Sequence, residues 1–141
     1  MVKPGFLSRN KVDSILLFLL ITLGSCLSNE IYFDSDQSMI FSCDGYRLKS
    51  VEIRNDNSEE FISITIKSGE VGDYGIAIGK VSERYNVIVN GAAKEDRLIR
   101  LKPSSKYTIT NFSIGDAGMG QLTVATDENG DIIASEDLNC N

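Results

Sequence analysis

The amino-acid sequence predicts an all-β protein, built as an antiparallel sandwich or a small barrel of about eight strands. After residue 29, apolar and polar residues alternate with a period of two in most segments, as in strands that bury one face. Turn-forming residues recur about every 8–15 residues. No long segment has the 3.6-residue period of an amphipathic helix. These three observations together favour many short strands in a single domain.

The predicted strands follow one another along the chain. Residues 61–67 give the clearest one, because three isoleucines share one face and polar side chains share the other. The pairs Asn90–Gly91 and Asn129–Gly130 predict hairpin turns. The other segments expected to contain strands are residues 31–33, 39–43, 48–54, 75–79, 85–89, 98–101, 106–111, 121–126 and 131–134.

Residues 1–28 are expected to be an export signal and not a part of the fold. Three cations precede an apolar run at residues 15–23 in which Thr22 is the one polar residue, and small residues follow at once. A helix of that run spans about 14 Å, too little to cross a hydrocarbon core of about 30 Å. The order of positive, apolar and small residues is that of a signal peptide, and a short buried helix is the other interpretation. We therefore expect one domain at residues 29–141.

Two cleavage sites fit this signal. Residues 23–26 (Leu-Gly-Ser-Cys) resemble the bacterial lipobox, in which Cys26 becomes the lipidated first residue. The alternative is cleavage by a conventional peptidase near Ser28. The lipobox resemblance implies a periplasmic protein on the outer membrane, because Leu27 supplies no acidic retention signal. Removal of residues 1–28 lowers the 14 basic and 20 acidic residues to 11 and 19.

The remaining cysteines predict one disulfide. Cys43 and Cys140 lie near the two ends of the exported domain, and an even cysteine count in an exported chain points to a bridge. The closed loop of about 98 residues corresponds to roughly 4–5 kcal/mol in the chain-entropy model.

The composition excludes several kinds of site. The chain has no His, which removes Ser-His-Asp, Cys-His and His-metal sites. Its net charge is -6 without a basic patch, so nucleic acid is not an expected partner. The carboxylates at residues 127–131 resemble half of a calcium loop, but Gly130 and Leu138 occupy the wrong positions. We expect a polar hairpin tip there, and no metal or other cofactor.

One stretch resembles a known fold family. Leu101, Pro103, Tyr107 and Ile109 match the Leu-x-Pro-x-x-x-Tyr-x-Ile stretch of fibronectin type III and other Ig-like domains. The resemblance implies an Ig-like sandwich in which the Tyr107 hydroxyl bonds back to upstream backbone. Residues 123–130 resemble the final hairpin of such domains, although the chain lacks the early-strand Trp.

Two families of exported proteins share further features with the chain. Small bacterial periplasmic lipoproteins regarded as immunity proteins against type VI secretion effectors resemble it in the lipobox, the early Cys, the stretch around Tyr107 and the final Cys. Membrane-bound lysozyme inhibitors resemble it at residues 39–45 and 138–140, but their middle segments are missing. These resemblances imply a non-catalytic envelope protein that binds and neutralises another protein, such as a basic toxin or a wall-cleaving enzyme. A structural or adhesive Ig-like surface module is the alternative, and an enzyme with paired carboxylates is the third possibility.

The candidate contact residues come from three places. Exposed aromatic side chains anchor many interfaces, which singles out two tyrosines. The acidic turn at residues 55–60 and the Gly-rich loop at 115–120 supply the others. The residues expected to bind a partner are Tyr46, Asp56, Glu59, Glu60, Tyr74, Asp116 and Met119.

Overall fold

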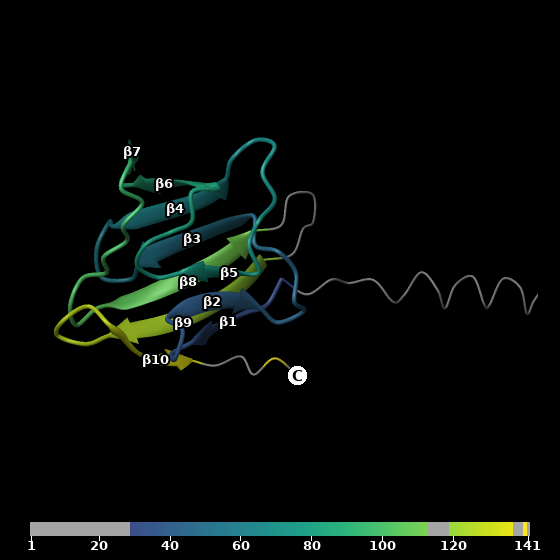
Figure 1. Ribbon diagram of the computed structural model, residues 1–141. Helices are drawn as coiled ribbons and strands as arrows, with labels where there is room; N and C mark the ends of the chain where they lie inside the picture. The colour runs from purple at the N-terminus through teal and green to yellow at the C-terminus, as the bar shows by residue number, and fades with distance from the viewer. Residues whose placement is uncertain (1–28, 113–118, 137–139, 141) are drawn as a thin grey trace, which may run out of the picture.

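The computed structural model describes residues 29–112, 119–136 and 140 (Figure 1). These residues form ten strands and no helix, in two antiparallel sheets. The all-β sandwich is therefore confirmed. Nine of the ten segments expected to contain strands do so, residues 98–101 do not, and residues 92–93 form an additional strand. The expected export signal, its Cys26 and Asp116 lie outside the described residues.

The smaller sheet has the order β1–β2–β5 and the larger sheet the order β10–β9–β8–β3–β4–β6–β7. The strands are β1 (Ile31–Asp34), β2 (Met39–Ser42), β3 (Ser50–Asn55), β4 (Phe61–Ile66), β5 (Gly75–Ala77), β6 (Tyr85–Val89), β7 (Ala92–Ala93), β8 (Lys106–Phe112), β9 (Met119–Thr126) and β10 (Ile132–Glu136). Figure 1 shows the three-stranded layer in front of the larger one.

The strand order follows the Ig-like pattern. Immunoglobulin-like sandwiches pair strands A, B, E and D in one sheet, and strands G, F and C, in some cases with C′, in the other. The orders β1–β2–β5 and β9–β8–β3–β4 match A–B–E and G–F–C–C′, and among the described residues no strand takes the place of D beside β5. The extra strands widen the larger sheet at both edges. β7 follows β6 through Asn90 and Gly91, whose φ angles of 50° and 83° suit the predicted tight turn.

The core lies between the two sheets and is largely aliphatic. Each strand buries alternate residues, as a half-buried strand must. Ile62 and Ile64 of β4 are buried, and Ile66 packs against them from the strand's end. Ile40 of β2 and Ile76 of β5 face this cluster from the smaller sheet.

The strand expected at residues 98–101 is wrong. Leu98 forms only an isolated bridge with Lys80, and the Ile99 N–H donates to the Gly79 carbonyl at 2.7 Å. Arg97 has a φ of 51°, which breaks the extended conformation just before the segment. Ile99 and Leu101 are still buried, so the segment packs onto the core as a loop.

The Tyr107 hydroxyl makes the backbone bond that the family resemblance implies. It accepts a hydrogen bond from the Lys102 backbone N–H at 2.7 Å and donates to Glu60 Oε2 at 2.5 Å. Burial raises the pKa of Tyr107, and the hydrogen bond to the Glu60 carboxylate raises it further. The side chain therefore ties the segment before β8 to the turn before β4.

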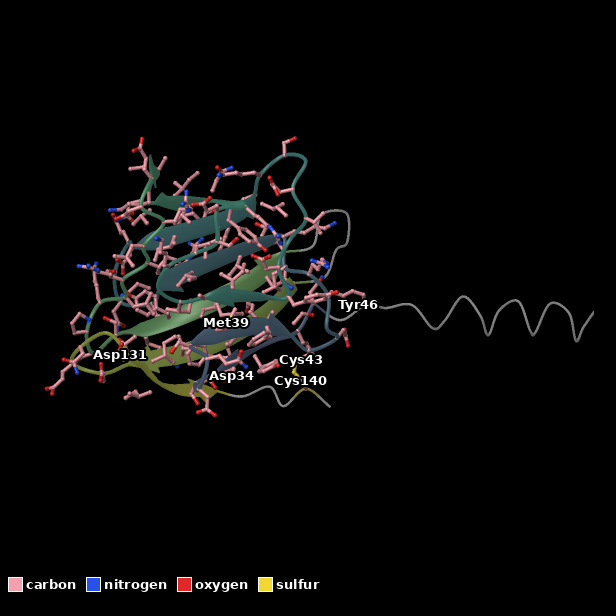
Figure 2. The ribbon with its side chains drawn as sticks, in the orientation of Figure 1. Asp34, Met39, Cys43, Tyr46, Asp131 and Cys140 are labelled. Carbon is pink, nitrogen blue, oxygen red and sulfur yellow. A yellow bond between two sulfur atoms is a disulfide. The ribbon has the colours of Figure 1, made fainter. Side chains whose placement is uncertain are left out.

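The predicted disulfide between Cys43 and Cys140 is present, with Cα atoms 5.1 Å apart. Cys43 directly follows β2 of the smaller sheet, and Cys140 lies beyond β10 of the larger one. Figure 2 shows the bridge at the same end of the sandwich as Tyr46. The bond therefore links the two layers at that end.

Candidate functional site

Two loop segments meet at the disulfide end of the sandwich. The Leu48 N–H donates to the Asp73 carbonyl at 2.8 Å, which joins the segment after β2 to the segment before β5. The backbones approach so closely at Gly72 that an added Cβ would lie 2.3 Å from the Leu48 carbonyl oxygen. Only glycine fits there, because backbone atoms cannot yield as a flexible side chain can.

A buried tyrosine clamps the same two segments. The Tyr85 hydroxyl donates to the Leu48 carbonyl at 2.8 Å and accepts from the Asp73 N–H at 2.6 Å. Burial is the main cause that raises the pKa of Tyr85. The sequence predicts a strand at Tyr85 but carries no signal for this clamp, because the bonded partners are backbone groups far away in the chain.

The clamped segments present an exposed aromatic surface, which we call the Tyr46–Tyr74 surface and define as Tyr46, Arg47, Val71 and Tyr74. Tyr46, Val71 and Tyr74 are 48%, 58% and 56% exposed. The Arg47 guanidinium carbon lies 4.3 Å from the centre of the Tyr74 ring, and Arg47 also donates to the Gly72 carbonyl at 2.9 Å. This cation–π contact holds the Tyr74 ring in place. The structure thus brings the two predicted tyrosines onto neighbouring segments and adds Arg47, which sequence reasoning missed.

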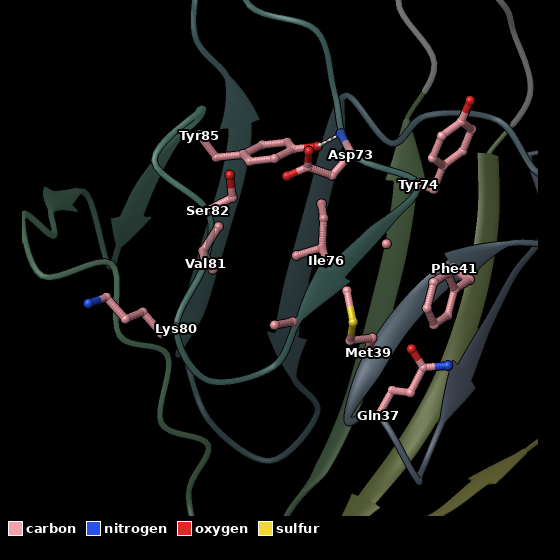
Figure 3. Close-up of a pocket in the computed structure, with 12 residues that line it drawn as sticks. Gln37, Met39, Phe41, Asp73, Tyr74, Ile76, Lys80, Val81, Ser82 and Tyr85 are labelled. Carbon is pink, nitrogen blue, oxygen red and sulfur yellow. Dashed lines mark hydrogen bonds between the residues drawn. The ribbon is translucent and has the colours of Figure 1, made fainter.

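An apolar groove of about 440 Å³ continues from Tyr74 along β5 (Figure 3). Met39 and Phe41 of β2 form one side, Val81 and Tyr85 line the other, and Ile76 lies between them. Ring and methyl atoms of Phe41 and Met39 lie over Gly75, where an added Cβ would be under 3 Å from both. Phe41 and Met39 can therefore pack across Gly75 because that residue has no side chain.

The predicted acidic residues lie at the opposite end of β3. Glu60 has only 10% of its side chain exposed and holds the Tyr107 hydroxyl. Asp56 accepts a hydrogen bond from Thr108 Oγ1 at 2.9 Å, while Glu59 is exposed. Asp56 and Glu60 therefore serve the fold, and the acidic turn does not join the tyrosines in one site.

Met119 is 61% exposed and lies on the outer face of the larger sheet. It borders a shallow depression there with Glu52, Arg54 and Thr108. Met119 starts β9 opposite Phe112, at the end of the sheet where β3 begins. It therefore shares an end of the molecule with the Tyr46–Tyr74 surface but faces another direction.

The hairpin tip at residues 127–131 is held by its own backbone. The Asp127 carboxylate accepts hydrogen bonds from the N–H groups of Asn129 at 2.8 Å and Asp131 at 2.9 Å. These bonds lower the pKa of Asp127, the one from Asn129 most. Within the described ranges, no cluster of three or more Cys, Asp or Glu side chains could hold a metal ion.

The fold and the site define a class, an Ig-like β-sandwich closed by one disulfide and carrying an exposed aromatic surface beside an apolar groove. Comparison with known proteins finds no matching family model, no matching characterised protein and no matching solved structure. In the part of the chain that the structure describes, no helix is long and apolar enough to cross a membrane.

Proposed function

We propose that this chain is a non-catalytic, exported envelope protein that binds and neutralises another protein, and that the Tyr46–Tyr74 surface makes the contact. The observation that carries the proposal is the pair of exposed tyrosines, Tyr46 and Tyr74, on two fixed backbone segments. Arg47 stacks on the Tyr74 ring and bonds to the Gly72 carbonyl. Tyrosine and arginine are the side chains that most often dominate binding energy at interfaces.

The rigidity of the surface supports this use. The Tyr85 clamp and the close approach at Gly72 fix the backbone of both segments. Arg47 stacks on the Tyr74 ring and also donates to the Gly72 carbonyl, so it connects the ring to the fixed backbone. Binding to an ordered surface loses less side-chain and loop entropy, which leaves more of the interaction energy as affinity.

The expected partner is basic, because residues 29–141 carry 11 basic and 19 acidic residues, a net charge of -8, and opposite charge raises the rate of association. A basic toxin or a wall-cleaving enzyme fits this chemistry and the resemblance to immunity lipoproteins and lysozyme inhibitors. A lipid on Cys26 would hold the protein on the periplasmic side of the outer membrane.

The test is capture of the partner from the native envelope by the exported chain with Cys26→Ser. The test variant is Tyr46→Ala with Tyr74→Ala. The control is Ile133→Ala, which truncates another exposed apolar residue, 66% exposed, on β10. We expect the chain and the control to retain one toxin or wall-cleaving enzyme stoichiometrically and to inhibit it, and the tyrosine variant to lose at least about tenfold in affinity, or about 1.4 kcal/mol. Equal retention by the tyrosine variant would contradict the proposal.

One observation favours the structural or adhesive module as a second candidate. β5 is an edge strand with an open side, and such edges can pair with a neighbouring subunit. Sedimentation velocity separates the two functions. A chain that assembles with copies of itself at micromolar concentration, and captures only copies of itself, is a structural module.

A further inference from the structure

The backbone of β5 has an unused side. Among the described residues β5 pairs with β2 alone, with Ile76 opposite Ile40. The Ile78 N–H donates to the Ser38 carbonyl at 2.9 Å, so the even-numbered residues turn their backbone groups toward β2. In an antiparallel ladder the residues between them point the other way. The N–H and C=O groups of Gly75 and Ala77 therefore face the free edge.

The free edge of β5 carries few of the features by which proteins block strand pairing. Such features include charges, proline and bulges on the edge strand, and β5 consists of Gly75, Ile76 and Ala77 only. By contrast, β10 at an edge of the larger sheet contains a register shift, and β7 at the other edge has two residues. β5 is short, but none of its three residues is charged or a proline.

The apolar groove lies along this edge (Figure 3). A strand placed beside β5 would alternate its side chains, so that every second one lies over the outer face beside Met39 and Phe41. Those two side chains are partly buried and supply apolar contact area. The edge thus offers backbone hydrogen bonds and a side-chain subsite together, which is the combination used in recognition by strand addition.

The groove itself contains one cation, Lys80, and one anion, Asp73, which pairs with Arg84. The excess negative charge beside the groove therefore comes from the neighbouring segment of the smaller sheet. Residues 29–46, which include β1 and β2, contain four acidic residues and no Lys or Arg. Asp34 and Asp36 belong to the β1–β2 hairpin, next to Gln37 of the groove. A basic segment beside β5 would be attracted to this acidic hairpin.

We infer that the free edge of β5 binds an extended segment of a basic protein as an added strand, with alternate apolar side chains of that segment in the groove. This inference rests on the proposed function and names the part of the partner that the site recognises. Gly75 and Ala77 supply up to four backbone hydrogen bonds, and Tyr74 lies where the strand enters.

The test uses a phage-displayed library of random twelve-residue peptides against the Cys26→Ser chain. We expect the retained peptides to alternate apolar residues and to carry net positive charge. Their binding should slow hydrogen exchange at the amides of Gly75 and Ala77. Ala77→Pro removes the outward N–H without touching the bonds to β2, and Ala77→Ser keeps that N–H as the matched control.

We expect affinity for the selected peptides to fall at least about tenfold in Ala77→Pro and to stay within about twofold in Ala77→Ser, since one lost hydrogen bond in a dry site is worth about 1.4 kcal/mol. A native melting temperature for Ala77→Pro checks that the fold is kept. If the melting temperature of Ala77→Pro is instead lowered, hydrogen exchange in the unsubstituted chain with bound peptide is the deciding measurement. Amides of Gly75 and Ala77 that exchange as fast with peptide as without it would overturn the inference.

Other outcomes overturn the inference in distinguishable ways. If Ala77→Pro keeps the native partner while the tyrosine variant loses it, the proposed function stands and strand addition fails. If both variants keep the partner, both proposals fail. If Ala77→Pro abolishes self-association of the chain, the occupant is a second copy and not a basic segment.

Discussion

Replacing Tyr107 by Phe should destabilise the sandwich strongly, although it removes a single oxygen atom. The ring is fully buried, and its hydroxyl joins the Lys102 N–H to the Glu60 carboxylate. The bond to the Glu60 carboxylate, whose side chain is nine-tenths buried, is worth roughly 1.5–3 kcal/mol, and the bond to the backbone roughly 0.5–1. Loss of both predicts a decrease of about 2–4 kcal/mol in the free energy of unfolding, or roughly 8–16 °C in Tm for a domain of this size.

Urea unfolding followed by circular dichroism measures this loss, with Tyr74→Phe as the control. The Tyr74 ring is exposed and its hydroxyl has no hydrogen bond among the described residues, so the control should change stability by under about 0.5 kcal/mol. A loss below about 1 kcal/mol in Tyr107→Phe would refute the reasoning.

The pH dependence gives a second check on Tyr107. Burial first, and the Glu60 bond second, raise its pKa in the folded state. The folded protein therefore keeps a proton that the unfolded chain loses near pH 10, so stability is fully present below that pH and falls as the pH rises. The stability of Tyr107→Phe should fall less steeply above pH 10 than that of the unsubstituted chain. The remaining slope comes from Tyr85, whose pKa is also raised. An unchanged alkaline slope would show that Tyr107 is not the group involved.

Three further predictions follow from the same structure. Gly72→Ala forces a Cβ against the Leu48 carbonyl oxygen, so it should lower Tm and weaken partner binding together; a native Tm in differential scanning fluorimetry would contradict this. Replacing Cys43 and Cys140 by Ser opens a loop with a sequence separation of 97 and should cost roughly 4–5 kcal/mol, measured as the urea midpoint against the oxidised chain; a shift below a quarter of that would contradict it. The backbone hydrogen bonds to Asp127 lower its pKa, so its contribution to stability is present above the usual Asp pKa and is lost as pH falls. Asp127→Asn should therefore reduce the difference between the urea midpoints at pH 7 and pH 3, and an unchanged difference would contradict this.

Local sequence patterns were sufficient for the layers of this fold. The isoleucines of β4 alternate with polar residues because one face is buried, and that face is the core face in the structure. Asn90 and Gly91 tolerate positive φ, so the β6–β7 turn could be placed from two residues. Tyr107 could be predicted because the motif around it has a fixed spacing.

Features that depend on distant contacts could not be predicted in this way. Ile99 and Leu101 have the two-residue spacing of a strand, but the φ of Arg97 and the burial of both side chains onto the core hold them in a loop. Glu60 appears in the sequence as one more surface carboxylate, because nothing near it indicates the Tyr107 hydroxyl. Arg47 was missed for the same reason, since its ring partner lies 27 positions further along.

The placement of the site also predicts an effect of the proposed lipid anchor. The described chain starts at Asn29, whose carbonyl accepts a hydrogen bond from Asn111 at 3.1 Å, at the end that carries Cys43 and Tyr46. Three residues span at most about 10 Å, so a lipid on Cys26 would hold this end next to the bilayer. Ala77 lies at the far end of β5, away from the bilayer.

Insertion of ten Gly and Ser residues after Cys26 should therefore speed association of the partner with the lipidated chain on vesicles. The same insertion should leave the association rate of the Cys26→Ser chain in solution unchanged. Stopped-flow fluorescence measures both rates, and equal rates for the short and long tethers would show that the partner approaches from the groove side alone.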